Sequence, residues 1–341
     1  MKTIKFAGLG WDGYTGQISR IKEGVQELGH SLDPENPDLI YCNDPTQYIN
    51  AIKLKRKFPK SFLILNFLDV PWHMPGVMKK LAIEATIMKR EANIVTVISK
   101  KVKKDLSKFY DGETEVIYNP VKDVKLSKEI SKSNDYLYVG RANDPIKRVK
   151  LIHETFKNEE KTLNEIIFCG FEDPKFGNYL GVVKDEKLTE LYNSSKFVLL
   201  PSKAEGIGLS MIEGMICGAV PIMCSDNLTA KEFAPEDFIC EPDHISIKKK
   251  INEINTDYEK FRTLALSYGE KYKVQFIEGC QNIGGLAKNY AEKLWDDLLG
   301  FADYCLHEDT TILCIEDGAF KHLSISDIVY QRKKLRKSLH F

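Results

Sequence analysis

The sequence predicts an α/β protein built from two doubly wound domains. Short apolar runs of strand length alternate along the chain with stretches of helical length, which is the pattern of parallel sheets covered by helices. The chain has 341 residues, 43% of them hydrophobic, so it is long enough for two domains with separate cores. A glycine-rich turn follows one of the apolar runs and enters a helix, which places the expected ligand site at the carboxyl edge of a sheet.

The charge balance and the cysteines argue against several classes of function. The chain carries 49 basic and 49 acidic residues, so we expect no nucleic acid partner and no polybasic membrane patch. The eight cysteines form no Cys-x-x-Cys pair, which indicates reduced thiols and a cytoplasmic protein. The first ten residues are too short and too polar for a signal peptide, and no apolar run approaches about 18 residues. We therefore expect no integral membrane association.

The first domain is predicted over residues 1–121. A short strand enters a loop with glycines at positions 8, 10, 13 and 16, and apolar residues then follow a helical spacing from Ile18 to Leu28. Many nucleotide-binding sheets begin with a strand, a glycine-rich loop and a helix in this order. The alternative is that the loop is an ordinary strand-to-helix turn that binds no nucleotide. The expected strands are Thr3–Ala7, Asp38–Cys42, Phe62–Phe67, Asn93–Ile98 and Glu115–Tyr118.

A polar, lysine-rich stretch at residues 122–134 is predicted to link the two domains, because it shows no apolar period. The second domain then covers residues 135–288, with further helices between Ile245 and Tyr272. A final helix, expected over 289–304, presents an apolar face. The expected strands of the second domain are Tyr136–Val139, Ile166–Gly170, Phe197–Leu200 and Ala219–Met223.

The stretch at residues 201–222, PSKAEGIGLSMIEGMICGAVPI, organises the second domain. It follows the Phe197–Leu200 strand, turns sharply, continues as a helix to about Cys217 and enters the next strand. The free N–H groups and positive end of such a helix suit a phosphate. Glu205 and Glu213 lie about two helical turns apart, so both can face one cleft and accept hydrogen bonds from paired hydroxyls. The alternative is that neither glutamate binds a ligand, one being a surface acid that caps the helix and the other simply solvated.

This stretch closely resembles the donor-sugar motif of retaining glycosyltransferases of family four, which have the GT-B fold of two Rossmann-like domains. The resemblance covers about residues 3–301 and is strongest over 136–222. It implies that Glu205 holds the sugar hydroxyls and Glu213 the ribose of the nucleotide. Gly214 stands where the family usually has alanine. The resemblance also implies donor contacts from the turn and the helix start, at Gly206, Ile207, Gly208 and Leu209.

A second motif, GRANDPIKR at residues 140–148, resembles the family segment whose arginine and lysine bind the donor diphosphate. Arg141 and Lys147 have the family's spacing, and two fixed cations would stabilise the charge that a leaving diphosphate gains. Arg148 replaces the family's glycine, which leaves the shape of the turn open. A solvated basic loop is the alternative.

Further resemblances name four more candidate residues. Gly16, in the first glycine loop, is implied to approach the donor phosphates, and Val183 is implied to contact the nucleotide base through its backbone. After the strand at Phe62–Phe67 the family carries a histidine that faces the acceptor, and this chain lacks it. Asp69 or His73 is expected to take that catalytic role. The alternative is that Asp69 only caps the segment that follows and that His73 is an ordinary loop residue.

The resemblance implies an enzyme that moves a sugar from a nucleotide-sugar donor to an unidentified acceptor with retention of anomeric configuration. No Asp-x-Asp pattern occurs near the donor segments, so we expect no metal and no other cofactor. The leaving phosphate is the expected base. The competing hypothesis is a GT-B protein that binds a sugar nucleotide without turnover, and the missing histidine is its best support.

The character of the sequence changes at Cys305. Residues 305–341 resemble the first block of an intein, which starts with a nucleophilic cysteine and continues as short strands around a turn, here Asp317-Gly318. No Thr-x-x-His and no terminal His-Asn follow, so the segment resembles the N-terminal fragment of a split intein with residues 1–304 as its extein. The implied partner is a complementary C-terminal intein fragment. A small β appendage is the alternative.

Overall fold

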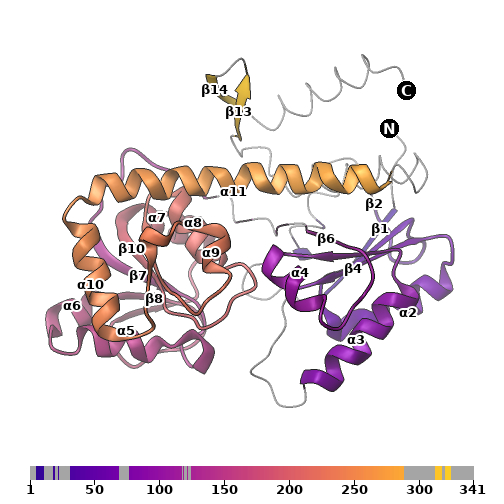
Figure 1. The fold of residues 1–341 in the computed structure, drawn as a ribbon, viewed down its shortest axis with the longest axis horizontal. Helices are drawn as coiled ribbons and strands as arrows, with labels where there is room; N and C mark the ends of the chain where they lie inside the picture. The colour runs from indigo at the N-terminus through magenta and orange to yellow at the C-terminus, as the bar shows by residue number, and fades with distance from the viewer. Residues whose placement is uncertain are drawn as a thin grey trace. The chain divides into compact units, whose positions relative to one another are not determined.

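The computed structural model describes residues 5–10, 18–19, 22, 31–68, 77–116, 118, 121, 124–287, 312–316 and 319–323, with side chains as far as Tyr272. The chain divides into two compact units, one formed by Met1–Pro120 with Val274–Phe341 and the other by Val121–Lys273. Each unit contains a six-stranded sheet with helices around it (Figure 1). Two parallel-sheet α/β domains, as predicted from the sequence, are therefore confirmed.

The sheet of the first unit has the strand order β2-β1-β3-β4-β5-β6, and its strands pair in parallel. Every residue of β3 and β4 is buried, as expected for central strands covered on both faces, and this explains why both are apolar except at Asn66, whose Oδ1 accepts the hydroxyl of Thr96. The sequence predicts β4 at its observed bounds, whereas β2 was not predicted. The strands are β1 (Lys5–Leu9), β2 (Ser31–Leu32), β3 (Leu39–Cys42), β4 (Phe62–Phe67), β5 (Ile94–Val97) and β6 (Thr114–Val116).

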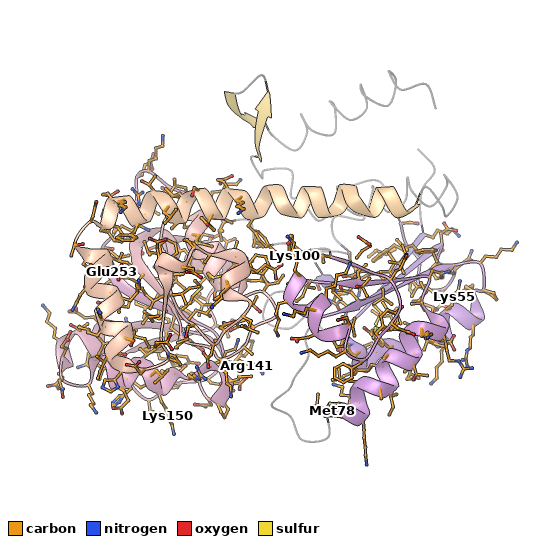
Figure 2. All side chains as sticks on the ribbon, in the orientation of Figure 1. Lys55, Met78, Lys100, Arg141, Lys150 and Glu253 are labelled. Atoms are coloured by element: carbon orange, nitrogen blue, oxygen red, sulfur yellow. The ribbon has the colours of Figure 1, made fainter. Side chains whose placement is uncertain are left out.

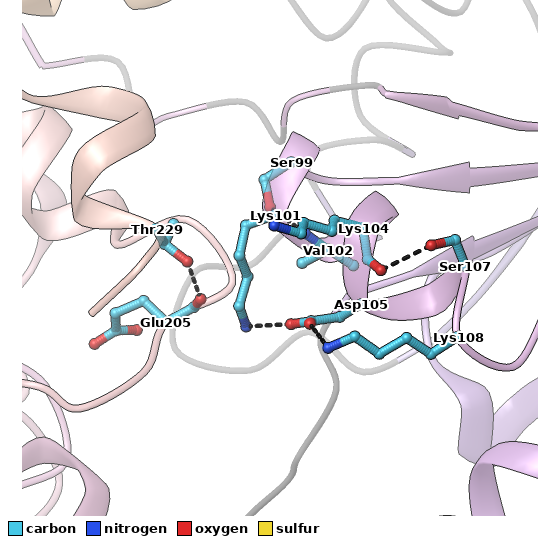
Figure 3. A network of polar contacts seen from close by, with 9 residues as sticks. All are labelled: Ser99, Lys101, Val102, Lys104, Asp105, Ser107, Lys108, Glu205 and Thr229. Atoms are coloured by element: carbon cyan, nitrogen blue, oxygen red, sulfur yellow. Dashed lines mark hydrogen bonds and ion pairs between the residues drawn. The ribbon is translucent and has the colours of Figure 1, made fainter. Parts of the chain in front are cut away.

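The helices of the first unit are η2 (Pro45–Gln47), α2 (Tyr48–Lys57), α3 (Val77–Glu91) and α4 (Lys100–Leu106). α4 begins directly after β5 because Ser99 caps it: its hydroxyl accepts the N–H of Val102 at 3.1 Å. Asp105 on the same helix is paired with Lys101 at 3.2 Å and with Lys108 at 2.9 Å (Figure 3). A nearly buried carboxylate is thus neutralised within one helix and its following turn.

The sheet of the second unit has the strand order β12-β11-β10-β7-β8-β9, again with parallel pairing. An aromatic cluster fills the core beside the central strands, with Tyr136 lying 4.6 Å from Phe156 and 5.6 Å from Phe197 between ring centroids. The strands are β7 (Asn134–Val139), β8 (Ile167–Cys169), β9 (Asn178–Gly181), β10 (Ser195–Leu200), β11 (Val220–Cys224) and β12 (Ile239–Cys240).

Helices follow most of these strands, as a doubly wound sheet requires (Figure 1). They are η3 (Pro145–Lys147), α5 (Val149–Phe156), α6 (Glu160–Glu165), α7 (Asp185–Ser194), α8 (Leu209–Ile216), α9 (Ala230–Phe233), η4 (Glu236–Phe238), α10 (His244–Asn255) and α11 (Tyr258–Ala287). The sequence predicts the helix at α8 and the helices after Ile245. The final helix expected over 289–304 lies outside the described residues.

Two glycines determine how α8 packs and where it ends. A Cβ on Gly214 would lie 2.7 Å from Cγ2 of Val198 in β10, so alanine would require this buried valine to move. Gly218 follows the helix with φ +70°, and the bonds Gly218 N–H to Met215 and Ala219 N–H to Gly214 close a Schellman motif. The departure from the family's alanine at position 214 therefore has a packing cause in this chain.

The long helix α11 passes close to the end of α8 (Figure 1). A Cβ on Gly269 would lie 2.8 Å from the backbone nitrogen of Ile216, so the two backbones approach closely enough to require glycine. Over the residues that the structure describes, no helix has both the length and the apolar character needed to cross a bilayer.

The segment expected to link the domains is attached to the second unit. Asn193 in α7 binds it twice, accepting the N–H of Ser127 at 2.7 Å and donating to the carbonyl of Lys125 at 2.8 Å. Val124 in the same segment is buried. These contacts make residues 124–134 part of the second unit's structure.

Lys132 adds a charged contact to this attachment. Its Nζ donates to the carbonyl of Tyr192 at 3.3 Å and to that of Cys217 at 3.1 Å. These carbonyls lie at the C-terminal ends of α7 and α8, where the helix dipole favours a cation. The amine is nevertheless largely withdrawn from water, and burial lowers the pKa of Lys132 from 10.5 to about 8.

In the C-terminal region, β13 (Ile312–Glu316) and β14 (Ala319–Leu323) pair antiparallel, with Glu316 opposite Ala319. The two strands expected around Asp317-Gly318 are therefore present. Cys305 lies outside the described residues, so this pair of strands does not bear on the predicted splicing chemistry.

The lowered pKa of Lys132 predicts a pH dependence of stability. The folded state binds this proton less tightly than the unfolded chain, so the stability contributed at Lys132 rises as pH increases from about 8 to 10.5. We expect the unfolding free energy of the wild type minus that of Lys132→Met to increase over this window by up to about 3 kcal/mol. Urea denaturation at closely spaced pH values measures it. Lys128→Met, which changes an exposed lysine of the same segment, is the control, and identical profiles for the two variants would contradict the assignment.

Candidate active site

Two charged residues far apart in the sequence meet in the second unit. Lys147 Nζ donates to Glu205 Oε1 at 2.6 Å, and the side chains are only 16% and 12% exposed. Lys147 ends η3, which follows β7, and Glu205 lies in the turn after β10. Because β7 and β10 are parallel neighbours, their carboxyl ends share one edge of the sheet. The structure thus brings together the predicted diphosphate ligand and the predicted sugar ligand.

Backbone contacts fix the turn that carries Glu205. The carbonyl of Glu205 accepts a hydrogen bond from the Thr229 hydroxyl, which comes from the loop after β11 (Figure 3). The N–H of Lys203 donates to the carbonyl of Ile146 at 2.8 Å and joins this turn to η3. Both the main chain and the side chain of Glu205 are therefore held before any ligand binds.

Arg141 lies at the surface of the same unit, 44% exposed (Figure 2). Its guanidinium pairs with Asp144 at 2.7 Å, and its carbonyl accepts the hydroxyl of Tyr138 at 3.0 Å. Asp144 also caps η3 by accepting the N–H of Ile146, and Glu172 accepts the N–H of Asn143 at 2.7 Å. Carboxylates therefore shape the whole basic loop, and the exposed guanidinium is accessible to an anion.

Arg148 shows how the turn forms without the family's glycine. It adopts the left-handed conformation with φ +51° and ψ +37°, which glycine takes at little cost. Its guanidinium binds Asp226 with two bonds, at 2.9 and 2.5 Å. The pairing with Asp226 raises the pKa of Arg148, which keeps the side chain charged.

The predicted donor loop leads into α8. Gly208 precedes the helix in a left-handed conformation, with φ +85° and ψ +55°, and Leu209 is the first helical residue. Ile207 is buried against the core, whereas Gly206 is half-buried. The first amides of a helix have no intrahelical partner, so this end of α8 offers donors to an anion.

Glu213 has a different environment from Glu205. It is 3% exposed, and its Oε2 accepts the hydroxyl of the fully buried Tyr192 at 2.8 Å. Burial raises the pKa of Tyr192 well above its ordinary value, so the tyrosine remains a proton donor. This bond joins α8 to α7. The role of Glu213 at the ribose remains a prediction.

Val183 lies between β9 and α7 and is half-buried. The neighbouring Gly181 has φ +71° and accepts the N–H of Gly170 at 2.9 Å. Gly16, Asp69, His73 and Cys305 lie outside the described residues, so their roles stay predictions.

Several residues that shape the site were not predicted from the sequence: Asp144, Tyr192, Asp226 and Thr229. Asp226 and Thr229 follow β11 at the same carboxyl edge that identified the other candidates, so the rule that ligands bind at this edge would have included them. Tyr192 fits the apolar face of α7, and nothing in that pattern indicates that its hydroxyl binds a glutamate.

The described residues contain no group of three His, Cys, Asp or Glu side chains placed to hold a metal. A small pocket in the second unit is lined by Ile152, Phe156, Leu199, Pro201, Ile222, Cys224 and Ile247. Its walls carry no charged side chain, so it is a packing gap beside the core and not a site for a nucleotide.

Residues 177–276 match the family described as "Glycosyl transferases group 1". Nearly all of the matched residues belong to the second unit, and they include Glu205 and the helix α8. A stretch of 105 residues is 33% identical to the O-antigen chain mannosyltransferase B of Escherichia coli. That stretch covers 30% of this chain and spans 27% of the mannosyltransferase.

Solved glycosyltransferase structures share the fold over most of the chain. Anabaena Alr3699/HepE in complex with UDP and glucose superposes with a TM-score of 0.68 at 16% identity, covering 84% of this chain and 100% of that one. The sucrose-phosphate synthase of Thermosynechococcus elongatus gives a TM-score of 0.61 at 18% identity, covering 74% of each chain. These superpositions confirm a fold of the GT-B type for the two units.

The Tyr192–Glu213 bond predicts a measurable loss of stability. Tyr192→Phe removes the hydroxyl and leaves a buried carboxylate oxygen without that donor, which should cost about 1–3 kcal/mol of unfolding free energy. Urea denaturation measures the change. Tyr179→Phe is the control, because the half-buried Tyr179 donates to the Gly170 carbonyl, which water can reach more easily. Equal losses in the two variants would show that Tyr192 contributes no special bond.

Proposed function

We propose that this protein is a glycosyltransferase that moves a sugar from a nucleotide-sugar donor to an acceptor with retention of configuration. The observation that carries the proposal is the Lys147–Glu205 pair at the carboxyl edge of the second sheet, beside the start of α8. The match of residues 177–276, which include Glu205 and α8, to glycosyl transferases group 1 supports the reaction class. Binding without turnover remains the less favoured alternative.

The two charges of the pair suit the two halves of a donor. A lysine and an exposed arginine can bind a diphosphate, and the amides at the start of α8 add dipoles directed at the same group. As the bond to the sugar breaks, the diphosphate gains negative charge, and Lys147 and Arg141 stabilise it. Glu205 would accept hydrogen bonds from the sugar hydroxyls, and Glu213 would hold the ribose. Neither step requires a metal ion, and the leaving phosphate serves as the base.

The pairing of Lys147 with Glu205 adds a specific feature to this scheme. With no donor present the lysine neutralises the glutamate, so a diphosphate must compete with the carboxylate for Lys147. Once the diphosphate holds the lysine, Glu205 is released to accept the sugar hydroxyls. Binding of the two halves of the donor is thereby coupled.

The donor is proposed to be a nucleotide-activated hexose. Solved neighbours are described with UDP-glucose or with UDP, and the curated relative is described as a mannosyltransferase. In the first unit, Asp69 or His73 is proposed to face the acceptor, and Gly16 to approach the donor phosphates. Val183 is proposed to contact the base.

Single substitutions of Lys147 and Glu205 test the diphosphate role and the sugar role separately. Lys147→Ala should weaken binding of UDP, GDP or ADP, whichever binds the wild type best, by about 1.5–3 kcal/mol. Glu205→Gln should keep or improve that binding, because the competing carboxylate is gone, and should lose turnover of the matching nucleotide sugar. Calorimetry measures the affinity, and release of the nucleoside diphosphate measures the turnover.

Lys150→Ala is the control, since this exposed lysine lies on α5, close to the loop at residues 140–148 that carries Lys147 (Figure 2). If Lys147→Ala binds the nucleotide as well as the control does, the diphosphate assignment is wrong. If Glu205→Gln keeps full turnover, the assignment of the sugar hydroxyls to Glu205 is wrong.

We also propose that residues 305–341 take part in protein splicing at Cys305. The resemblance to the first block of an intein supports it. In the first step Cys305 Sγ attacks the carbonyl carbon of Tyr304, the peptide C–N bond breaks, and the released amine takes a proton. This step requires a thiolate and hydrogen-bond donors directed at the developing oxyanion. The complementary intein fragment is expected to supply those donors.

The lone chain should therefore remain intact when a small thiol is added. Mixed with a complementary C-terminal intein fragment, it should pass residues 1–304 to the sequence that follows that fragment, and Cys305→Ala should abolish the transfer. Intact-mass spectrometry follows each species, with Cys280→Ala as the matched cysteine control. Splicing by the Cys305→Ala chain would exclude this role.

A further inference from the structure

Arg148 occupies an unfavourable backbone conformation next to the candidate site. Among the described residues, Arg148 and Lys175 are the non-glycine residues with positive φ, at +51° and +68°. A left-handed conformation costs free energy for a side chain with a Cβ, and it persists only where the surrounding structure compensates. Arg148 follows Lys147 directly, so the conformation at 148 sets the direction of the chain on leaving the lysine.

The compensating contact is the pair with Asp226. The guanidinium Nη1 and Nη2 atoms bind Oδ1 and Oδ2 at 2.9 and 2.5 Å, and the side chains are 22% and 34% exposed. Two parallel bonds fix the orientation of both groups, which a single lysine contact would not do.

The pair closes a ring of three loops. They follow β7 (residues 140–148), β10 (201–208) and β11 (225–229), and these strands are adjacent in the sheet in the order β11-β10-β7. The ion pair of Lys147 with Glu205 joins the first loop to the second. The Thr229 hydroxyl joins the second loop to the third by donating to the Glu205 carbonyl (Figure 3). Arg148 and Asp226 then join the third loop back to the first, across the central strand.

We propose that Arg148 and Asp226 are positioning residues that clamp Lys147 and Glu205 in the geometry required by the donor. Arg148 is the residue after Lys147, and Asp226 lies three residues before Thr229, which binds the carbonyl of Glu205. The clamp therefore constrains both Lys147 and Glu205. It acts through Lys147 and Glu205. This inference rests on the proposed function, since it concerns the same site.

The clamp can be separated from a general contribution to stability. Arg148→Gly removes the guanidinium but relieves the left-handed strain, so the melting temperature should change little. Affinity for whichever of UDP, GDP and ADP binds the wild type most tightly should fall about tenfold, the effect of losing about 1.4 kcal/mol. Arg148→Lys, which keeps the charge without the paired bonds, should fall between the glycine variant and the wild type. Calorimetry on the full chain measures the nucleotide affinity, with UDP, GDP and ADP tested first to find the tightest ligand. Thermal unfolding of the full chain measures the melting temperature.

Lys175→Gly is the matched control, because Lys175 is also left-handed and pairs only locally, with Asp173 at 3.0 Å. It should gain the same backbone relief and leave nucleotide affinity unchanged. Asp226→Asn should reproduce the loss seen in Arg148→Gly, and the double variant should lose no more than either single one, because both act through one contact.

The outcomes distinguish this inference from the proposed function. If Lys147→Ala loses nucleotide binding while Arg148→Gly keeps it, the clamp is wrong and the proposed function stands. Additive losses in the double variant would also overturn the clamp. If the wild type binds none of the three nucleotides, the proposed function fails and the clamp fails with it.

Discussion

The ion pair between Lys147 and Glu205 is the contact on which the candidate site depends. Two charges 2.6 Å apart, each largely withdrawn from water, are stable together, whereas either one alone would cost roughly several kcal/mol. The pair therefore holds two loops in register at the edge of the second sheet while no ligand is bound. In the proposed function a diphosphate competes with the glutamate for the lysine, so donor binding exchanges one anionic partner of Lys147 for another.

The remainder of the second unit immobilises the helix that starts at this edge. α8 is tied to α7 in its middle by the Glu213–Tyr192 bond and at its end by Lys132, which contacts the carbonyls of both helices. Gly214 lets it approach β10, and Gly269 lets α11 approach its last turn. With these contacts in place, the amides at the start of α8 are fixed in position, and a preorganised dipole costs little reorganisation when charge develops nearby.

The site also shows how a departure from a family pattern can be accommodated. Arginine at position 148 keeps the left-handed turn expected of glycine, and its side chain finds a carboxylate on another loop. Similarly, the segment between the domains looks like a flexible linker in composition, but Asn193 and Lys132 attach it to the second unit. In both cases local preference is outweighed by a specific polar contact that only the folded chain provides.

The sequence by itself determined the alternation of strands and helices, since buried parallel strands such as β3, β4 and β10 contain long apolar runs. A glycine turn after a buried strand identified the loop that carries Glu205, and resemblance to the diphosphate motif of the family identified the loop that carries Lys147. The tertiary structure alone decided which charges meet. Lys147 was predicted to bind a diphosphate and is paired with Glu205, Glu213 is paired with Tyr192, and Asp226 is paired with Arg148. Periodicity reports burial along one segment, whereas a pair of charges depends on the order of strands in the sheet, which brings residues from β7, β10 and β11 to one edge.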